Sequence, residues 1–301
     1  MPLSRKYLRP EVIARLRGLQ LRARTIAAGV LSGLHRSAYH GYSVEFAEHR
    51  QYVPGDDIRH IDWRLFGRKD RLYIKQYEEE TNLTCCLLLD ASNSMRYGSG
   101  ALNKFDYAAC LGAALAWLLI HQQDGVGLVT FDHELRANLP PRSGTGQLVN
   151  LLTLMEATAP AAETDVKVLL HQLAGSLPRR ALVVLLSDLL APVEDLISGF
   201  EHLTHAGHEL VVLHVLDHDE WELPFYENML FEGLEEPLRL LADPQTLRRS
   251  YRNVVQRFVT RVRTACLQQG ADYVPISTRD ALDGVLSGYL ARRGKRGGRR
   301  R

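Results

Sequence analysis

From residue 83 onward, the sequence alternates between short apolar runs and longer amphipathic segments. The apolar runs have strand length and contain almost no polar residues; they lie at 83–89, 126–131, 181–186, 209–215 and 273–276. Strands that are apolar throughout are buried on both faces, as happens when helices cover both sides of a parallel sheet. This alternation predicts an α/β fold with a doubly wound, mostly parallel sheet of Rossmann type.

The segments between the apolar runs have helical periodicity. Helices are expected at 104–121, 147–156, 165–174, 193–205 and 244–268, with a further one starting near residue 278. The longest of them is entered through Asp243, a residue that favours the helix N-cap. Residues 229–241 could form a hairpin.

The first 80 residues are organised differently. Residues 9–35 carry apolar side chains at three- and four-residue spacing, which predicts an amphipathic helix. Residues 39–75 are rich in aromatic and turn-forming residues, and their alternation indicates short strands. We therefore expect three parts: an N-terminal helix with a small β-rich region at 1–80, the α/β domain at 81–291, and a basic disordered tail at 292–301.

The net charge of +2 conceals three zones of different charge. Residues 1–75 hold 15 basic and 7 acidic side chains, residues 76–291 hold 15 and 28, and residues 292–301 hold 7 and none. Such asymmetry indicates interaction surfaces rather than a particular fold. The arginine-rich tail could bind a polyanion without sequence preference. It has no aromatic residues on which bases stack, so we expect no specific nucleic-acid partner.

Two absences and the cysteines bear on location. No apolar run approaches the roughly 18 residues that a membrane span requires, and the N-terminus lacks the apolar region of a signal peptide. The four cysteines show no metal-binding spacing, and Cys85 and Cys86 are adjacent in an apolar run. They are therefore interpreted as reduced and buried. We expect a cytoplasmic protein without a transmembrane segment.

Oxygen-bearing side chains follow two of the predicted strands. Asp90, Ser92 and Ser94 come directly after the run 83–89, and Asp188 follows the run 181–186. Ligands collect at the carboxyl ends of strands in doubly wound sheets. A carboxylate with hydroxyls two and four residues later suits a hard cation, Mg²⁺ first and Mn²⁺ or Ca²⁺ as alternatives. The other interpretation is a serine-rich turn that caps the helix at 104–121.

Nucleotide binding is not expected. The segment 98–104 resembles a phosphate-binding loop, but Asn103 stands where glycine is needed and Phe105 where serine or threonine is needed. The segment 144–146 lacks the third glycine of a dinucleotide loop and does not follow a predicted strand.

The order of the oxygen-bearing residues resembles the metal-ion-dependent adhesion site of von Willebrand factor A domains. Asp90, Ser92 and Ser94 match its first motif, Thr164 matches its threonine, and Asp188 matches its final aspartate. The resemblance implies that the two serines and the threonine bind the metal directly, while the aspartates act mostly through waters. It also implies an open metal position for a carboxylate of a partner protein.

An upstream segment resembles the signature of the bacterial proteins called domain of unknown function 58, which are usually encoded beside AAA+ ATPases of the MoxR type. This resemblance implies an adaptor or co-chaperone that works with such an ATPase and a protein client. Candidates for a docking surface are Asp56, Asp57, Arg59, Asp62 and Trp63; the alternative is a turn whose carboxylates pair with its own arginines and amides. The matching residues are Phe46, Arg50, Tyr52, Pro54, Gly55, Asp56, Asp57, Arg59, Ile61, Asp62 and Trp63.

The rival function is a metal-assisted hydrolase in which the metal ion activates water. It requires a general base near the metal, and only Asp132 and Glu134, after the run 126–131, are adjacent in sequence to a suitable strand end. The sequence shows no convincing nucleophile or base. We therefore expect an interaction module that is not an enzyme.

Overall fold

The computed structural model divides into two compact units: residues 1–37 together with 83–301, and residues 38–82. In the smaller unit, β1 (His49–Gln51) pairs antiparallel with β2 (Tyr73–Lys75), within the region where short strands were expected. The structure describes residues 10, 16, 18–36, 49–51, 73–75, 83–161, 166–178, 180–234 and 238–297.

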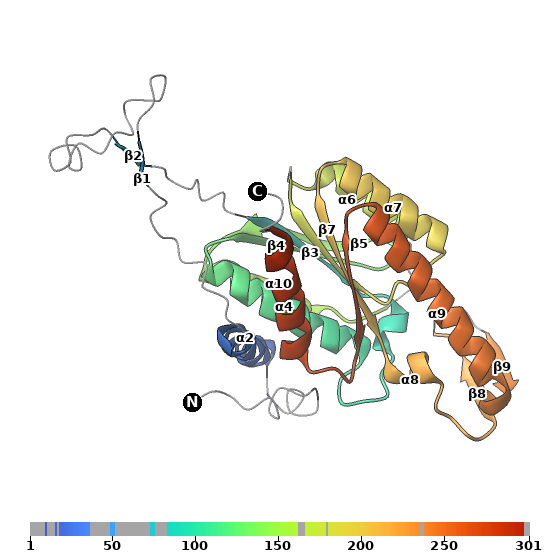
Figure 1. The fold of residues 1–301 in the computed structure, drawn as a ribbon. Helices are drawn as coiled ribbons and strands as arrows, with labels where there is room; N and C mark the ends of the chain where they lie inside the picture. Colours follow the sequence, from blue (N-terminus) through green and yellow to red (C-terminus); the bar gives the residue numbers. More distant parts are fainter. Residues whose placement is uncertain are drawn as a thin grey trace. The chain divides into compact units, whose positions relative to one another are not determined.

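A six-stranded sheet forms the centre of the larger unit (Figure 1). Its order is β10-β7-β6-β3-β4-β5, and all neighbouring pairs are parallel except β4 with β5. This arrangement confirms the predicted doubly wound, mostly parallel sheet. The strands are β3 (Thr84–Asp90), β4 (Gly125–Phe131), β5 (Leu135–Arg142), β6 (Leu182–Ser187), β7 (Glu209–Leu216) and β10 (Asp272–Ser277).

Helices cover both faces of this sheet, and each face has its own apolar cluster. Leu87 and Leu89 of β3 contribute to one cluster, and Leu88 between them contributes to the other. A strand whose successive side chains both enter a core reads as a continuous apolar run. One face holds α2 (Leu19–Arg36), α4 (Lys104–His121), α5 (Thr145–Ala157) and α10 (Leu282–Gly297), and the other holds α6 (Val166–Ser176), α7 (Val193–His205) and α9 (Pro244–Gln268).

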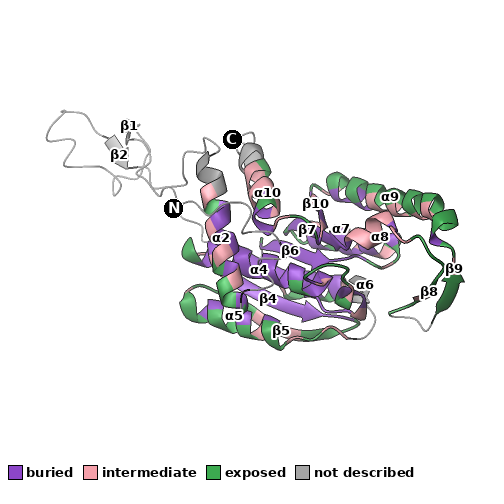
Figure 2. Ribbon diagram, turned by 90° about the horizontal axis from the view of Figure 1, so that it is seen from below, coloured by how far each residue is buried: buried purple, intermediate pink, exposed green. Residues whose placement is uncertain are grey.

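Helix α4 is buried around most of its circumference because the sheet lies on one side and α2 packs on another (Figure 2). Ala23, Ile26, Ala27 and Val30 of α2 are fully buried in this contact layer. The N-terminal helix therefore belongs to the α/β unit. This differs from the division at residue 80, which grouped the helix with the short strands that follow it.

Between β7 and β10 the chain forms α8 (His218–Glu222), the hairpin of β8 (Met229–Glu232) and β9 (Arg239–Ala242), and then α9. The hairpin lies where it was expected. Helix α9 begins after Asp243, whose carboxylate accepts a hydrogen bond from the Gln245 amide at 2.9 Å. In the part of the chain that the structure describes, none of the helices has both the length and the apolar character to cross a membrane.

Two features differ from the sequence-based expectation. Strand β5 was not predicted, because its sequence contains Pro140 and Pro141, which cannot donate to a sheet ladder; an edge strand tolerates them. The expected disordered tail from residue 292 is wrong over its first residues, because α10 continues to Gly297. Arg293 donates to the Glu209 carboxylate at 2.6 Å and to the Tyr289 hydroxyl at 3.1 Å, which holds this end of the helix.

Candidate metal site at the carboxyl edge of the sheet

The two strands that carry the predicted aspartates are neighbours. Leu89 of β3 lies opposite Leu186 of β6 in a parallel pair, so Asp90 and Asp188 leave the sheet at the same edge. Both side chains are buried. The structure therefore places these two carboxylates close enough for their charges to interact.

Asp90 is poorly compensated for a buried carboxylate. Its Oδ1 accepts the Ser92 amide at 2.9 Å, and its Oδ2 accepts the Ser187 hydroxyl at 2.5 Å. Burial, and then the charge of Asp188, raise the pKa of Asp90 from its ordinary value to about 7, against the opposing effect of these hydrogen bonds. A bound cation would relieve this cost.

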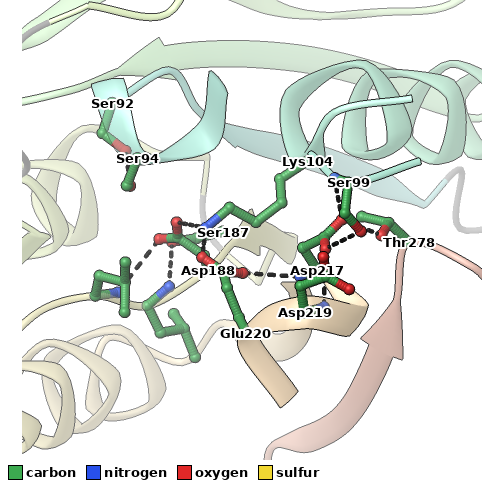
Figure 3. Close-up of polar contacts among 12 residues, drawn as sticks. Ser92, Ser94, Ser99, Lys104, Ser187, Asp188, Asp217, Asp219, Glu220 and Thr278 are labelled. Atoms are coloured by element: carbon green, nitrogen blue, oxygen red, sulfur yellow. Dashed lines mark hydrogen bonds and ion pairs between the residues drawn. The ribbon is translucent and has the colours of Figure 1, made fainter. Parts of the chain in front are cut away.

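Ser92 and Ser94 lie beside Asp90 at the start of the short 3₁₀ helix η3 (Asn93–Arg96). Their Oγ atoms are 3.0 Å apart, and both side chains are buried (Figure 3). The Ser92 side chain makes no capping hydrogen bond to η3. The cap of α4 is Asn103, which accepts the Asp106 amide at 2.7 Å. The serines therefore do not serve as helix caps, which was the alternative interpretation of this motif.

Asp188 has a cationic partner that the sequence analysis did not identify. Lys104, at the start of α4, donates from Nζ to Asp188 Oδ2 at 2.7 Å and to Glu220 Oε1 at 2.5 Å (Figure 3). Burial alone would lower the pKa of Lys104, but the charges of Asp188 and Glu220 outweigh it and raise the pKa above its usual value. Because these carboxylates raise its pKa, Lys104 stays charged although it is fully buried, and its charge is shared between the two carboxylates.

The turn after β6 holds Asp188 in place through strained backbone. Leu189 has a φ of 56°, in the left-handed region that non-glycine residues rarely adopt. The Ser187 hydroxyl accepts the Leu189 amide at 2.9 Å, and Asp188 Oδ1 accepts the Leu190 amide at 3.3 Å. Non-glycine residues in this conformation cluster at functional sites.

His214 of β7 supports the same turn from below. One ring nitrogen lies 2.9 Å from the Asp188 carbonyl oxygen, and the other lies 2.6 Å from the Tyr273 hydroxyl. Burial lowers the pKa of His214 to about 4, despite the opposing charge of Asp188. The ring is therefore neutral near pH 7, and Lys104 is the cation that compensates Asp188.

A second polar cluster lies at the end of β7, and the sequence analysis did not identify it either. Asp217 accepts the Ser99 amide at 3.1 Å, the Ser99 hydroxyl at 2.6 Å, the Thr278 hydroxyl at 2.7 Å and the Asp219 amide at 2.9 Å. Although burial opposes it, these hydrogen bonds, led by that of the Ser99 hydroxyl, lower the pKa of Asp217. Glu220 accepts the Asp217 amide at 2.8 Å, which links this cluster to Lys104.

The donor set fits a hydroxyl-rich cation site rather than a carboxylate cage. Among the described residues, no three His, Cys, Asp or Glu side chains are grouped so as to hold a metal ion. Asp90, Ser92, Ser94 and Asp188 instead offer two carboxylates and two hydroxyls. Thr164, the fifth predicted ligand, lies outside the described residues, as do the docking candidates Asp56, Asp57, Arg59, Asp62 and Trp63.

Asp132, one of the two bases expected for a hydrolase, makes contacts within the β4–β5 turn. Asp132 accepts the Glu134 amide at 3.2 Å and lies 3.1 Å from His133 Nδ1 and 3.4 Å from Arg136 Nε. Its carboxylate therefore serves the β4–β5 turn. Nothing in this arrangement directs it toward Asp90.

Comparison with known proteins identifies the family. The family described as "Protein of unknown function DUF58" matches residues 48–261. The chain belongs to this family. Relatives include the uncharacterized proteins Rv1480 of Mycobacterium tuberculosis and Mb1516 of Mycobacterium bovis. Each is 29% identical over 230 residues, which cover 75% of this chain and 72% of the relative.

Solved structures agree on the fold of this DUF58 protein. The conserved hypothetical protein BatB from Bacteroides thetaiotaomicron is similar with a TM-score of 0.50 at 15% identity, over 71% of this chain and 99% of BatB. The SpRpn10 VWA domain matches with a TM-score of 0.39 at 12% identity, over 68% of this chain and 93% of that domain. The BatB match agrees with the α/β fold and its mostly parallel central sheet.

Proposed function

We propose that this DUF58 protein is a metal-dependent protein-interaction module. Asp90, Ser92, Ser94, Thr164 and Asp188 would hold Mg²⁺, or another hard divalent cation, and a carboxylate of a partner protein would bind the metal. The observation that carries the proposal is the buried hydroxyl pair of Ser92 and Ser94 beside the poorly compensated carboxylate of Asp90.

The charge balance of this site favours recognition of an acidic group. Serine hydroxyls are neutral ligands, and Lys104 already compensates part of the charge of Asp188. A divalent ion in such surroundings keeps more of its positive charge than one held in a carboxylate cage. An incoming Asp or Glu would therefore gain a strong charge-assisted contact.

Access to the site depends on local movement. Asp90, Ser92, Ser94 and Asp188 are each at most 4% exposed. Asn93, between the two serines, donates from Nδ2 to the carbonyl oxygen of Leu234 in the β8–β9 hairpin. A partner carboxylate would reach the metal only after an opening of this loop, which would couple partner binding to the position of the hairpin turn.

The wider role is a further part of the proposal. We propose that the protein acts in the cytoplasm as an adaptor or co-chaperone between a MoxR-type AAA+ ATPase and a protein client. Support comes from the DUF58 match, the α/β fold shared with BatB and the four buried, unpaired cysteines, which suit a reducing compartment. Asp132, one of the two candidate bases of the alternative hydrolase, is engaged in the β4–β5 turn.

Calorimetric titration tests the metal site. Mg²⁺, Mn²⁺ and Ca²⁺ should each be titrated into the full-length protein and into Asp90→Ala, Ser92→Ala and Ser99→Ala. The wild type should bind, and the first two variants should lose binding. Ser99→Ala is the matched control, because its hydroxyl lies at the same sheet edge but serves Asp217. Equal binding by wild type and Asp90→Ala would overturn the proposal.

A pull-down tests the partner. The wild type should capture a MoxR-type ATPase encoded beside its gene in the presence of Mg²⁺ and release it on addition of EDTA, and Ser92→Ala should not capture it. Metal-dependent cleavage of a phosphoester by the protein alone would instead support the hydrolase.

A further inference from the structure

Strand β9 of the β8–β9 hairpin is mostly exposed (Figure 2), and apolar side chains are uncovered on both faces of the hairpin. Leu240 and Leu241 are consecutive residues of one strand, so their side chains point to opposite faces, and both are exposed, Leu241 by 73%. Leu230 on the paired strand is also exposed. A two-stranded hairpin that stands alone is only marginally stable in water. This one is short and apolar, and it needs a further surface to cover it.

The uncovered side chains extend from the hairpin onto the start of α9. Of the fifteen large apolar side chains that are exposed in the described part of the chain, nine lie between residues 226 and 254. They include Tyr226 before the hairpin, and Leu247 and Val254 on α9. Such a concentration of exposed apolar side chains marks an interaction surface rather than ordinary exposure.

Opposite charges lie side by side in this region. The acidic hairpin segment, residues 226–234 and 238–243, contains three acidic residues, Glu227, Glu232 and Asp243, and one arginine. Helix α9 contains six arginines and no acidic residue. A groove of about 630 Å³ runs along the start of α9 and α8, lined by Arg248, Arg249, Arg252 and Trp221 among others. The same patch therefore carries an acidic apolar element and a basic groove.

The groove retains cationic groups for a partner. Arg248 donates to the carbonyl oxygens of Leu223 and Phe225, and Arg252 pairs with Glu222. Arg249 is exposed, and no carboxylate in the described residues forms an ion pair with it. Arginine and tryptophan are the residues that contribute most to protein–protein interfaces.

We propose that a second copy of this chain covers the patch. The acidic hairpin segment of each copy would lie in the basic groove of the other. A two-fold interface requires one self-complementary patch, so that each contact occurs twice. This patch meets that requirement because it holds both complementary elements within one short stretch of sequence. The proposal does not depend on the metal site.

Two other occupants fit less well. An anionic lipid surface would attract α9 but repel the three acidic residues of the hairpin segment, which carries the leucines that would have to insert. A different protein with an acidic apolar segment would occupy the groove, but the hairpin leucines would remain exposed. The second copy uses both elements.

Sedimentation velocity of the full-length protein, from low to high micromolar concentration, tests the proposal. The wild type should change from monomer to dimer as concentration rises. Leu241→Glu and Arg249→Glu should each weaken dimerisation by about tenfold or more, which corresponds to about 1.4 kcal/mol. Val149→Glu changes an exposed side chain of α5; it is the matched control and should dimerise as the wild type does. Circular dichroism should show that all variants are folded.

A charge exchange provides the decisive measurement. Glu227→Arg, in the exposed acidic segment, should impair dimerisation as Arg249→Glu does. In an equimolar mixture the two variants should form a heterodimer, because both of its contacts again join opposite charges. A wild type that is monomeric throughout, or variants that dimerise normally, would overturn the proposal. So would a monomer that binds an acidic, leucine-rich synthetic peptide in the groove, which would assign the groove to another protein.

Discussion

Two aspartates at the same edge of one sheet show opposite behaviour. Asp90 ends β3, Asp217 follows β7, and both are fully buried. Burial and the charge of Asp188 raise the pKa of Asp90, whereas hydrogen bonds from Ser99 and its neighbours lower the pKa of Asp217 despite burial. The difference lies in the surroundings of the two carboxylates. Four groups donate hydrogen bonds to Asp217, whereas Asp90 lies near a second carboxylate, that of Asp188.

This contrast separates a structural carboxylate from a candidate functional one. Asp217 caps α8 through the Asp219 amide and joins it to the segments that hold Ser99 and Thr278, so it needs no further ligand. Burial and the charge of Asp188 disfavour the charged form of Asp90, and a nearby cation would relieve this cost. Lys104 does not bond to it, because its ammonium group is shared by Asp188 and Glu220.

Replacement of Lys104 by methionine should have the largest effect. Lys104→Met leaves Asp188 and Glu220 buried or half-buried without their cation, and breaking a buried ion pair in this way costs about 3–5 kcal/mol. The free energy of unfolding, measured by urea denaturation in EDTA, should fall by about that amount. Lys104→Arg should lose less, because it keeps the charge. A Lys104→Met variant as stable as the wild type would mean that the two carboxylates do not need a cation.

Removal of the structural carboxylate should come next. Asp217→Ala leaves the Ser99 and Thr278 hydroxyls and two amides without their acceptor. We expect a loss of about 2–4 kcal/mol, since buried unsatisfied donors are costly. Urea denaturation measures the loss, and calorimetry on the folded fraction should show Mg²⁺ binding that matches the wild type. Loss of Mg²⁺ affinity without loss of stability would reverse the roles assigned to Asp217 and Asp90.

The sequence predicted the strands and the helix at this edge of the sheet, because these elements depend on local patterns. The apolar runs located β3 and β6, with Asp90 directly after the first and Asp188 two residues after the second, so both aspartates could be placed at strand ends. The structure adds that the two strands are neighbours. Helix α4 was predicted with its observed bounds, from its periodicity. Such features need only the residues of one element and the general rules for parallel sheets.

The partners of these aspartates could not be predicted, because they depend on contacts between distant segments. Lys104 reaches Asp188 across 84 residues, and Asp217 collects Ser99 and Thr278 across 118 and 61 residues. Lys104 starts an otherwise apolar helix just after the serine motif, which is a weak signal for a buried charge. The metal assignment, with Thr164 as a ligand, remains a prediction.

Replacement of Asp90 should change the free energy of unfolding in the opposite direction from Asp217→Ala. Asp90→Asn removes a buried negative charge, so the metal-free protein should gain about 1–3 kcal/mol of unfolding free energy at pH 8. Addition of Mg²⁺ should stabilise the wild type and leave Asp90→Asn unchanged, because only a ligand that binds the native state stabilises it. Thermal denaturation with and without EDTA measures both effects.

The unfolding free energy gained by Asp90→Asn should depend on pH in a defined direction. A raised pKa means that native Asp90 binds its proton more tightly than the unfolded chain does. Its contribution to stability is therefore most favourable at about pH 4 and is lost as the pH rises to about 7. The difference between Asp90→Asn and wild type should grow over this window and level off above it. Because only this difference is compared, titration of other groups such as His214 cancels. A difference that is constant from pH 4 to 8 would contradict the raised pKa.

The smallest effect on stability is expected when one hydroxyl group that donates to each aspartate is removed. Ser187→Ala removes a donor to Asp90, and Ser99→Ala removes a donor to Asp217. Each should cost about 1–2 kcal/mol at pH 8, where both carboxylates are charged. At pH 5 native Asp90 is protonated and its hydrogen bond is weaker, whereas Asp217 stays charged because its pKa is lowered. The cost of Ser187→Ala should therefore shrink between pH 8 and pH 5, while that of Ser99→Ala stays constant. If both costs were equally dependent on pH, the two aspartates would share one environment and the contrast between them would fail.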